Sequence, residues 1–393
     1  MEIYDKLGVK RVINCVSTTS PLGSSVVHPD VMEAMKDTSK YFICLDDLQY
    51  KAGKVIAELT NAEAAIVTSG CDAALTMATA ACMMKGTPLD RYNLSLDRPS
   101  REQGEWYSWM QKLPNDTDGI KNEIILQQCH LNSYSQAHRV AGAKIIPAGT
   151  ERQCNTNDIE NKINDSTAAI AFVGMYAYRG VSLEEVLRIS KLHSIPIIMD
   201  ASYTLPPRIN LKRWGSMGVD LVCYSGGKSI RGPTDTGILC GRRNLVTLAA
   251  IQMSPHHGVG RGFKVDKTQI VGLLKALQIY VEQDDNEEFS SRKNKAQYIS
   301  NNIRNLRGVH QVEIKVPKTG LLRGWPVVTL SLNEKYFSFT TKEVVDRLYT
   351  GNPGIWTYYD NILCPGGITM NTQNLLEGEE IIVIKRLREI LGT

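Results

Sequence analysis

The stretch that decides the fold is residues 219–233, which read VDLVCYSGGKSIRGP. Its first half is an apolar run of strand character that stops at Ser225. Two glycines follow and allow a tight turn, and a single lysine, Lys228, comes directly after them. A second apolar run begins at Thr236, so we expect Lys228 to lie in a turn between two buried strands. A lysine in such a place is poorly hydrated, which favours the uncharged, nucleophilic amine that forms Schiff bases.

Two other interpretations of Lys228 compete with a Schiff-base role. One is a surface lysine at a strand end, because most lysines are exposed. The other is a phosphate-binding P-loop, because Gly227-Lys228-Ser229 matches the tail of the pattern GxxxxGK[S/T] after a strand. That pattern requires glycine at position 222, where the chain has valine, and a helix where it has Gly232-Pro233. The stretch therefore disfavours a P-loop and leaves the surface lysine and the Schiff-base lysine open.

Strands and helices are predicted to alternate before Lys228. Apolar runs of strand character occur at residues 64–67, 123–127, 143–147, 168–173 and 195–200, and segments of helical character follow the first four. Continuous apolar strands that alternate with helices indicate a mostly parallel sheet covered by helices on both faces. The predicted fold class is therefore α/β, followed by a smaller C-terminal α+β domain.

Polar residues occur where these predicted strands end. They are Ser69 with Gly70, His130, Asp200, and Ser225 with Lys228. The carboxyl ends of parallel strands meet at one edge of a sheet, and ligands bind at that edge. The first pair also precedes a long helix, and such a junction directs free backbone N–H groups toward an anion. Each position has an ordinary structural explanation, but together they predict a binding site.

The length of 393 residues allows one large and one smaller domain. We expect an N-terminal arm over residues 1–46, a large α/β domain over 47–284 and a small α+β domain over 285–393. The polar segment 86–122 is predicted to be a long excursion that forms a lid or an interface.

Charge and cysteine usage exclude several classes of protein. The net charge of +4 is small for this length, so no extensive nucleic-acid surface is expected. The nine cysteines form no CxxC pattern and no cluster with histidine, which predicts core residues in a reducing compartment and no metal site. There is no signal-peptide pattern and no apolar run long enough to cross a bilayer. We therefore expect a cytoplasmic protein without a membrane partner.

With these residues in view, the chain resembles the fold-type I pyridoxal-phosphate enzymes. Within them it resembles the branch that contains L-seryl-tRNA(Sec) selenium transferase and proteins like D-glucosaminate-6-phosphate ammonia-lyase. The pieces that carry the resemblance occur in order along nearly the whole chain: AIVTSGCDAA (65–74), QQCHLNSY (127–134), IIMDAS (197–202), YSGGKSIRGP (224–233) and GRGFK (260–264).

The resemblance implies a role for each candidate residue. Lys228 would bind pyridoxal 5'-phosphate as a Schiff base and later move the α-proton of the substrate. Asp200 would pair with the pyridine nitrogen, and His130 would lie against the ring. The other implied cofactor contacts are Ser69, Gly70, Cys71, Asp72, Ser202 and Ser225. The candidates for binding a substrate carboxylate or phosphate are Arg231, Arg261 and Lys264.

The resemblance also implies a reaction and an assembly. We expect a lyase that acts on a small amino acid or amino sugar acid through Cα-deprotonation and β-elimination. Alternatives are a transferase or an aldolase-type enzyme with the same cofactor, a P-loop-like nucleotide-binding protein, and a catalytically inactive scaffold. A second subunit usually completes the site in this fold, so a homodimer or larger homo-oligomer is expected.

Two departures from the family pattern affect these expectations. Cys71-Asp72 replaces the small residues usual at the phosphate turn, which puts an acidic side chain close to the cofactor. The chain also lacks a clear counterpart of the RNA-binding region of the selenium transferase, which together with the small net charge argues against a tRNA substrate.

Overall fold

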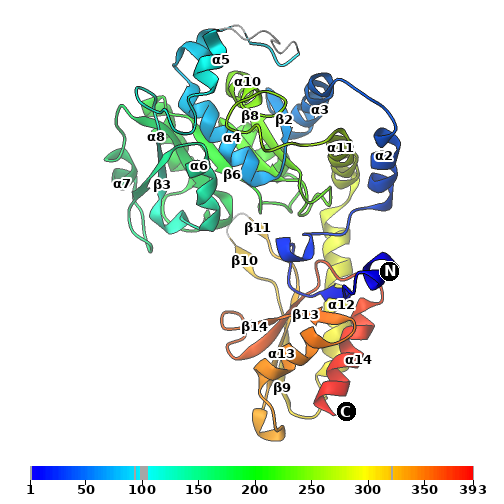
Figure 1. Ribbon diagram of the computed structural model, residues 1–393. Helices are drawn as coiled ribbons and strands as arrows, with labels where there is room; N and C mark the ends of the chain where they lie inside the picture. Colours follow the sequence, from blue (N-terminus) through cyan, green and yellow to red (C-terminus); the bar gives the residue numbers. More distant parts are fainter. Residues whose placement is uncertain (1, 93, 98–104, 320–321, 393) are drawn as a thin grey trace. The chain divides into compact units, whose positions relative to one another are not determined.

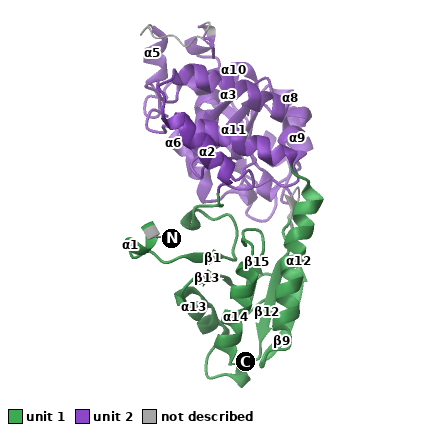
Figure 2. Ribbon diagram, turned by 90° about the vertical axis from the view of Figure 1, so that its right-hand side faces the viewer, with its two compact units in different colours: residues 1–26, 283–318, 323–393 green, residues 27–282, 319–322 purple. Residues whose placement is uncertain are grey.

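The computed structural model describes residues 2–92, 94–97, 105–319 and 322–392. The chain divides into two compact units (Figure 2). The larger unit comprises residues 27–282 with 319–322, and the smaller one comprises residues 1–26, 283–318 and 323–393. The predicted division into an arm, a large domain and a small domain at residues 46 and 284 stays a prediction. Part of the predicted excursion 86–122 lies outside the described residues.

Within the described residues, the larger unit is built on a seven-stranded sheet in the order β2-β8-β7-β6-β5-β3-β4 (Figure 1). The strands are β2 (Ala64–Thr68), β3 (Glu123–Gln127), β4 (Lys144–Ala148), β5 (Thr167–Val173), β6 (Ile197–Asp200), β7 (Leu221–Ser225) and β8 (Gly237–Gly241). Strands β4, β3, β5, β6 and β7 pair in parallel, whereas β8 runs antiparallel to both β7 and β2. The mostly parallel α/β sheet that the sequence predicts is confirmed.

The order of the strands decides which helices cover which face. The chain passes from β2 to β3 and on to β4 in one direction across the sheet, and then from β4 through β5 and β6 to β7 in the other. Because crossovers between parallel strands are right-handed, helices in the two directions lie on opposite faces. One face therefore carries α4 (Cys71–Met84) and α6 (Gln136–Val140), and the other carries α7 (Thr156–Glu160), α8 (Leu183–His193) and α9 (Asn210–Met217).

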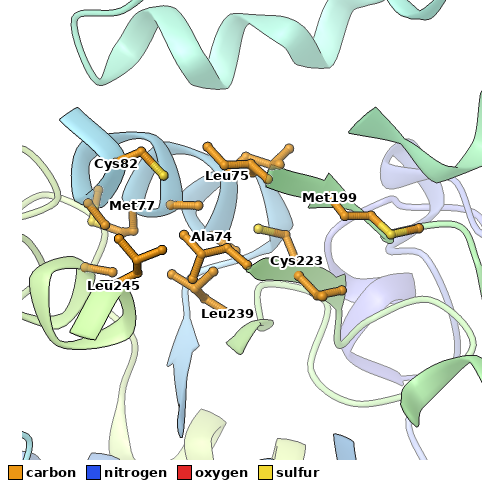
Figure 3. Close-up of a cluster of buried hydrophobic side chains, with 14 of the residues drawn as sticks. Ala74, Leu75, Met77, Cys82, Met199, Cys223, Leu239 and Leu245 are labelled. Carbon is orange, nitrogen blue, oxygen red and sulfur yellow. The ribbon is translucent and has the colours of Figure 1, made fainter. Parts of the chain in front are cut away.

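Helix α4 is the central helix of the core. From Ala73 to Met84 every residue is buried, as expected for a helix that is small and apolar on all sides. Ala74 and Met77 of α4 pack beside Cys223 of β7 and Leu239 of β8 (Figure 3). This packing fixes the N-terminus of α4 relative to the ends of β6 and β7.

The edge strand β2 is covered by α3 (Leu45–Thr60). The side-chain amide of Gln49 accepts a hydrogen bond from the Val67 N–H at 3.0 Å and donates one to the Val67 carbonyl at 2.8 Å. One turn later, Gly53 packs so closely that an added Cβ would lie 2.0 Å from the Ala65 carbonyl oxygen. Edge strands expose unpaired backbone groups, and α3 here supplies partners for them.

The other helices of the larger unit are α2 (Pro29–Ser39), α5 (Glu105–Met110), α10 (Arg243–Ile251) and α11 (Lys267–Glu282). Helix α10 packs against α4 and β2, and α11 packs against α2 and α3. None of the helices in the described part of the chain is long and apolar enough to span a membrane.

The smaller unit contains an antiparallel sheet in the order β14-β15-β12-β9, as the described residues show it. Its strands are β9 (Val309–Lys315), β12 (Val327–Leu332), β14 (Tyr358–Asp360) and β15 (Gly367–Asn371), with β1 (Val12–Asn14) paired in parallel to β13 (Gly354–Trp356). Its helices are α1 (Glu2–Lys6), α12 (Asp285–Ile303), α13 (Thr341–Thr350) and α14 (Glu379–Leu391), and two short strands are β10 (Lys318–Thr319) and β11 (Leu322–Arg323). The predicted C-terminal α+β fold is confirmed.

Candidate active site

Strands β6 and β7 bring two of the predicted residues to one edge of the sheet. Asp200 is the last residue of β6 and pairs with Cys223 of β7, and Lys228 follows the end of β7. The Lys228 Nζ donates a hydrogen bond to the Ser202 Oγ at 3.4 Å. The Asp200 Oδ1 accepts a hydrogen bond from the Ser202 N–H at 2.9 Å. Ser202 therefore links the lysine and the carboxylate at the carboxyl edge.

The turn that holds Lys228 depends on close backbone packing. An added Cβ at Gly226 would lie 2.2 Å from the Thr236 Oγ1, and one at Gly227 would lie 2.6 Å from the Thr234 Cα. The Gly226 N–H also donates to the Thr236 carbonyl at 2.8 Å. Residues 229–236 form turns and no helix before β8 begins, all of them being described. A P-loop requires a helix at this point, so that alternative is wrong for this chain.

A tyrosine that the sequence analysis did not identify lies beside the lysine. The half-buried Lys228 ammonium lies 5.0 Å from the centre of the Tyr203 ring, a cation–π distance. The neighbouring Ser229 Oγ donates to the Leu205 carbonyl at 2.8 Å, which ties the Lys228 turn to the segment after β6. Lys228 is therefore not a freely solvated surface lysine.

The N-terminus of α4 reaches the same edge. Gly70 is its N-cap residue, with a φ of 88° that favours glycine, and nothing lies within 4 Å of where its Cβ would be. An added Cβ at Gly237 of β8 would lie 2.4 Å from the Gly70 carbonyl, so the two glycines pack together. The N–H groups of the first turn have no carbonyl partner within the helix and attract anions. The open space in front of Gly70 suits a phosphate.

Electrostatics connect this helix end to the lysine and the aspartate. Burial raises the pKa of the Cys71 thiol well above its usual range, the charge of Asp200 raises it further, and Lys228 opposes the shift. Burial and the charge of Asp200 also raise the pKa of the Asp72 carboxyl, again against Lys228. The charges of Asp200 and Lys228 therefore act on the first turn of α4.

His130 is fully buried beside the end of β5. Its Nδ1 accepts a hydrogen bond from the Val173 N–H at 3.3 Å, so its Nε2 carries the proton and donates to the Arg179 carbonyl at 3.2 Å. Burial lowers the pKa of His130 to about 4, which keeps the ring neutral. Val173 pairs with Asp200 in the sheet, so the histidine lies next to the Asp200 strand with both ring nitrogens already bonded.

The remaining predicted residues differ in their connection to Lys228. Ser69 is half-buried beside Gly70, and Ser225 is half-buried at the end of β7, where it pairs with Gly237. Arg231 has a left-handed φ of 59°, and its N–H donates to the Lys228 carbonyl at 3.0 Å. Arg261 bonds to the Ser254 Oγ at 3.4 Å and Lys264 is exposed. Among the described residues, neither of these last two cations directly contacts Lys228.

Two sizeable cavities of the larger unit lie away from Lys228. One of about 450 Å³ is lined by α3, β2 and α10, and one of about 700 Å³ lies near the amino ends of β6 and β7. Neither is lined by Lys228 or Asp200. Lys228 and Asp200 thus lie at the carboxyl edge of the sheet and not in either of these cavities.

Comparison with known proteins agrees with this arrangement. A family model described as L-seryl-tRNA selenium transferase matches residues 135–307. D-glucosaminate-6-phosphate ammonia lyase of Salmonella typhimurium is 27% identical, over 99% of this chain and 97% of that protein. The 5'-C-glycyluridine monooxygenase-decarboxylase of a Streptomyces species is also 27% identical, over 99% of this chain and 92% of that protein.

Among solved structures, that of D-glucosaminate-6-phosphate ammonia-lyase superposes with a TM-score of 0.84 at 26% identity, over 99% of this chain and 98% of that one. The predicted resemblance to the fold-type I pyridoxal-phosphate enzymes is confirmed, and so is the narrower resemblance to the ammonia-lyase and selenium transferase proteins. Pyridoxal 5'-phosphate, the cofactor that this resemblance implies, is the cofactor of that group of enzymes.

Proposed function

We propose that this chain, which has the fold of the fold-type I pyridoxal-phosphate enzymes, is a pyridoxal-phosphate-dependent lyase that acts on a small amino acid or amino sugar acid. The reaction removes the Cα proton and eliminates a β-leaving group. The observation that carries the proposal is the meeting of Lys228, Asp200 and the N-terminus of α4 at one sheet edge. The full-length similarity to a protein named as an ammonia lyase supports the lyase assignment.

The residues present fit the cofactor. The cofactor supplies an electron sink that stabilises negative charge at Cα. Its phosphate would be held by the backbone of Gly70, Cys71 and Asp72 at the helix N-terminus, with Ser69 and Ser225 beside it. Asp200 would pair with its ring nitrogen. The open space at Gly70 supports this assignment, because a side chain there would fill the phosphate cradle.

Lys228 is proposed to anchor the cofactor covalently and then to move the α-proton. Both tasks require an amine held in one place. The hydrogen bond to Ser202 at 3.4 Å and the Tyr203 ring at 5.0 Å restrict where Nζ can go. The backbone N–H of Ser202 in turn donates to the Asp200 carboxylate, so Asp200 helps to hold the residue that contacts Lys228.

His130 is proposed to lie against the face of the cofactor ring and not to transfer a proton. Both of its ring nitrogens are bonded to backbone groups, and the buried ring is neutral. A proton-transferring histidine needs a nitrogen free to reach the substrate. A rigid, neutral ring suits a packing surface better.

Arg231, Arg261 and Lys264 are proposed to bind substrate anions. Arg231 is adjacent to the Lys228 turn, which supports this assignment most directly. For Arg261 and Lys264 the proposal rests on the resemblance and on a site completed by a second copy of the chain. We further propose a cytoplasmic homodimer or larger homo-oligomer.

A transferase is the second candidate function. The match of residues 135–307 to a family model described as L-seryl-tRNA selenium transferase favours it. The two candidates share α-proton removal and differ in what happens to the β-carbon. A lyase releases the leaving group and an unsaturated or keto product, whereas a transferase adds a new group to the β-carbon.

The proposal is tested by exchange and product analysis of the cofactor-loaded protein in deuterated water. We expect deuterium to replace the α-proton of the substrate and the β-leaving group to be released. Water then hydrolyses the remaining unsaturated amino acid, so ammonia and a keto acid should appear. D-glucosaminate 6-phosphate, with small amino acids alongside, is the first compound to test. Release of a leaving group only when a second nucleophile is added would favour the transferase. No α-proton exchange with any of these compounds would contradict both.

A further inference from the structure

The crevice between the carboxyl ends of β3 and β5 is a topological switch point. From β3 the chain continues through α6 on one face, and from β5 it continues through α8 on the other. Connections that leave two adjacent strands in opposite directions open a crevice in which α/β proteins bind ligands. Two segments border it: residues 128–130 after β3, which include His130, and residues 174–181 after β5.

The segment 174–181 is fixed to both sides of this crevice. On the β3 side, the buried Gln127 side chain accepts from the Val181 N–H at 2.7 Å and donates to the Val181 carbonyl at 3.1 Å. On the β6 side, an added Cβ at Gly174 would lie 3.0 Å from the Asp200 carbonyl oxygen. The segment therefore runs between the His130 turn and the end of the Asp200 strand.

Arg179 presents a positioned cation in this segment. Its guanidinium lies 4.5 Å from the centre of the Tyr176 ring and 5.2 Å from that of Tyr178. One of its N–H groups donates to the Cys129 carbonyl at 3.5 Å, while its own carbonyl accepts from His130. Among the residues that the structure describes, no carboxylate forms an ion pair with it. The side chain is exposed, so the rest of its planar fork is available to a ligand.

We propose that Arg179 binds a second anionic group of the substrate, away from the reacting carbon. The substrate is then an amino acid or amino sugar acid with a phosphate monoester or a carboxylate at its far end. A planar guanidinium held on aromatic rings matches either oxyanion with two parallel hydrogen bonds. This inference rests on the proposed function, because it concerns the substrate of that same site.

The test compares Arg179→Gln, Arg179→Lys and wild type on matched pairs of compounds, with α-proton exchange as the readout. The pairs are D-glucosaminate 6-phosphate with D-glucosaminate, and glutamate with glutamine. In the pair whose anionic member the enzyme uses, we expect Arg179→Gln to raise the KM for that anionic compound about 10- to 100-fold. This is the usual effect of losing a charged hydrogen bond. Arg179→Lys should lie between, and the neutral member should be unaffected. Whether the phosphate or the carboxylate pair responds identifies the anion.

Arg213→Gln is the matched control, because Arg213 is also an exposed arginine over an aromatic ring, that of Trp214 at 5.2 Å. A second readout needs no turnover: binding of inorganic phosphate or acetate to the cofactor-loaded protein by calorimetry. The bound cofactor occupies the phosphate site at the N-terminus of α4, so any anion that still binds must bind at another site. We expect wild type and Arg213→Gln to bind one of these anions and Arg179→Gln to lose that binding.

The outcomes separate this inference from the proposed function. If wild type takes up no cofactor or exchanges no α-proton, the proposed function fails, and the inference fails with it. If wild type is active but Arg179→Gln affects both members of a pair equally, or behaves like Arg213→Gln, only the inference is overturned. Activity restricted to neutral compounds would also overturn it.

Discussion

Two buried histidines give the larger unit a dependence on pH. Burial lowers the pKa of His130 and of His138 to about 4 in the folded chain, against an ordinary value of 6.5. In the unfolded chain both histidines therefore become protonated below about pH 6.5. In the folded chain they stay neutral until about pH 4. The stability that the neutral rings provide is fully present above the unfolded pKa and is lost as the pH falls from about 6.5 to about 4.

We predict a loss in unfolding free energy of about 1.4 kcal/mol per pH unit for each of these histidines in that window. His138→Asn should remove one such contribution and leave that of His130 in place. The exposed His193→Asn is the control and should keep the wild-type slope. Urea unfolding followed across the window measures this slope. An equal slope in wild type and His138→Asn would show that burial of this ring does not control acid sensitivity.

At the scale of single residues, the sequence predicts best where a polar residue ends a buried strand. The position of Asp200 and Lys228 at the carboxyl edge could be predicted from that signal, whereas their roles could not. Tyr203 could not, because its place beside Lys228 depends on how the segment after β6 folds back, which no local pattern specifies. Arg179 carried a usable signal, since β5 was predicted to end at Val173 and the polar segment that follows lies at the same edge.

At the scale of elements, the contact between α3 and β2 is sensitive to substitution. In Gly53→Ala the new Cβ would lie 2.0 Å from the Ala65 carbonyl oxygen. The backbone of α3 or of β2 would have to move, and either movement would disturb the hydrogen bonds between Gln49 and Val67. We predict a loss of about 1–3 kcal/mol in unfolding free energy, the usual range for overpacking. Because β2 leads into Gly70, cofactor affinity should fall as well.

Gly262→Ala is the control for that substitution. Nothing lies within 4 Å of where its Cβ would be, and its φ is not in the left-handed region. Chemical unfolding of both variants should therefore separate Gly53→Ala from the wild type and leave Gly262→Ala close to it. A Gly53→Ala protein as stable as the wild type would show that α3 does not pack on the edge strand as described.

Elements with strong periodicity or a buried apolar run were predictable, and short ones were not. The limits expected for β3 agree with the structure, whereas α9, α10 and β15 were not predicted. Helix α9 contains Gly215 and spans eight residues, so its pattern is too short to stand out. The predicted boundary at residue 284 stays a prediction, and Asp284 caps α12 by accepting hydrogen bonds from the Asn286 and Glu287 N–H groups.

At the scale of the whole molecule, we expect the functional state to contain more than one copy of the chain. The segment Tyr41–Phe42–Ile43 is exposed, and the Phe42 side chain is fully so. Monomeric proteins rarely leave such a run uncovered, which supports a subunit contact there. We predict that light scattering finds a dimer or larger assembly and that Phe42→Ser weakens it. An active, purely monomeric wild type would contradict the expectation.

The overall architecture was predictable because alternation along the chain reports a doubly wound sheet. The antiparallel β8 was not, since its sequence between Gly237 and Gly241 does not differ in kind from that of a parallel strand. The substrate-binding role of Arg261 and Lys264 stays a prediction, because neither directly contacts Lys228 among the described residues.

The most direct test of the central claim is the visible spectrum of the purified protein before and after borohydride, followed by mass mapping of the reduced adduct. We predict an absorption band that disappears on reduction, with the cofactor attached at Lys228. In Lys228→Ala both the band and the adduct should be absent, while Lys264→Ala should still carry the adduct at Lys228. A protein that stays colourless when pyridoxal 5'-phosphate is supplied, or that carries the adduct at another lysine, would contradict the account.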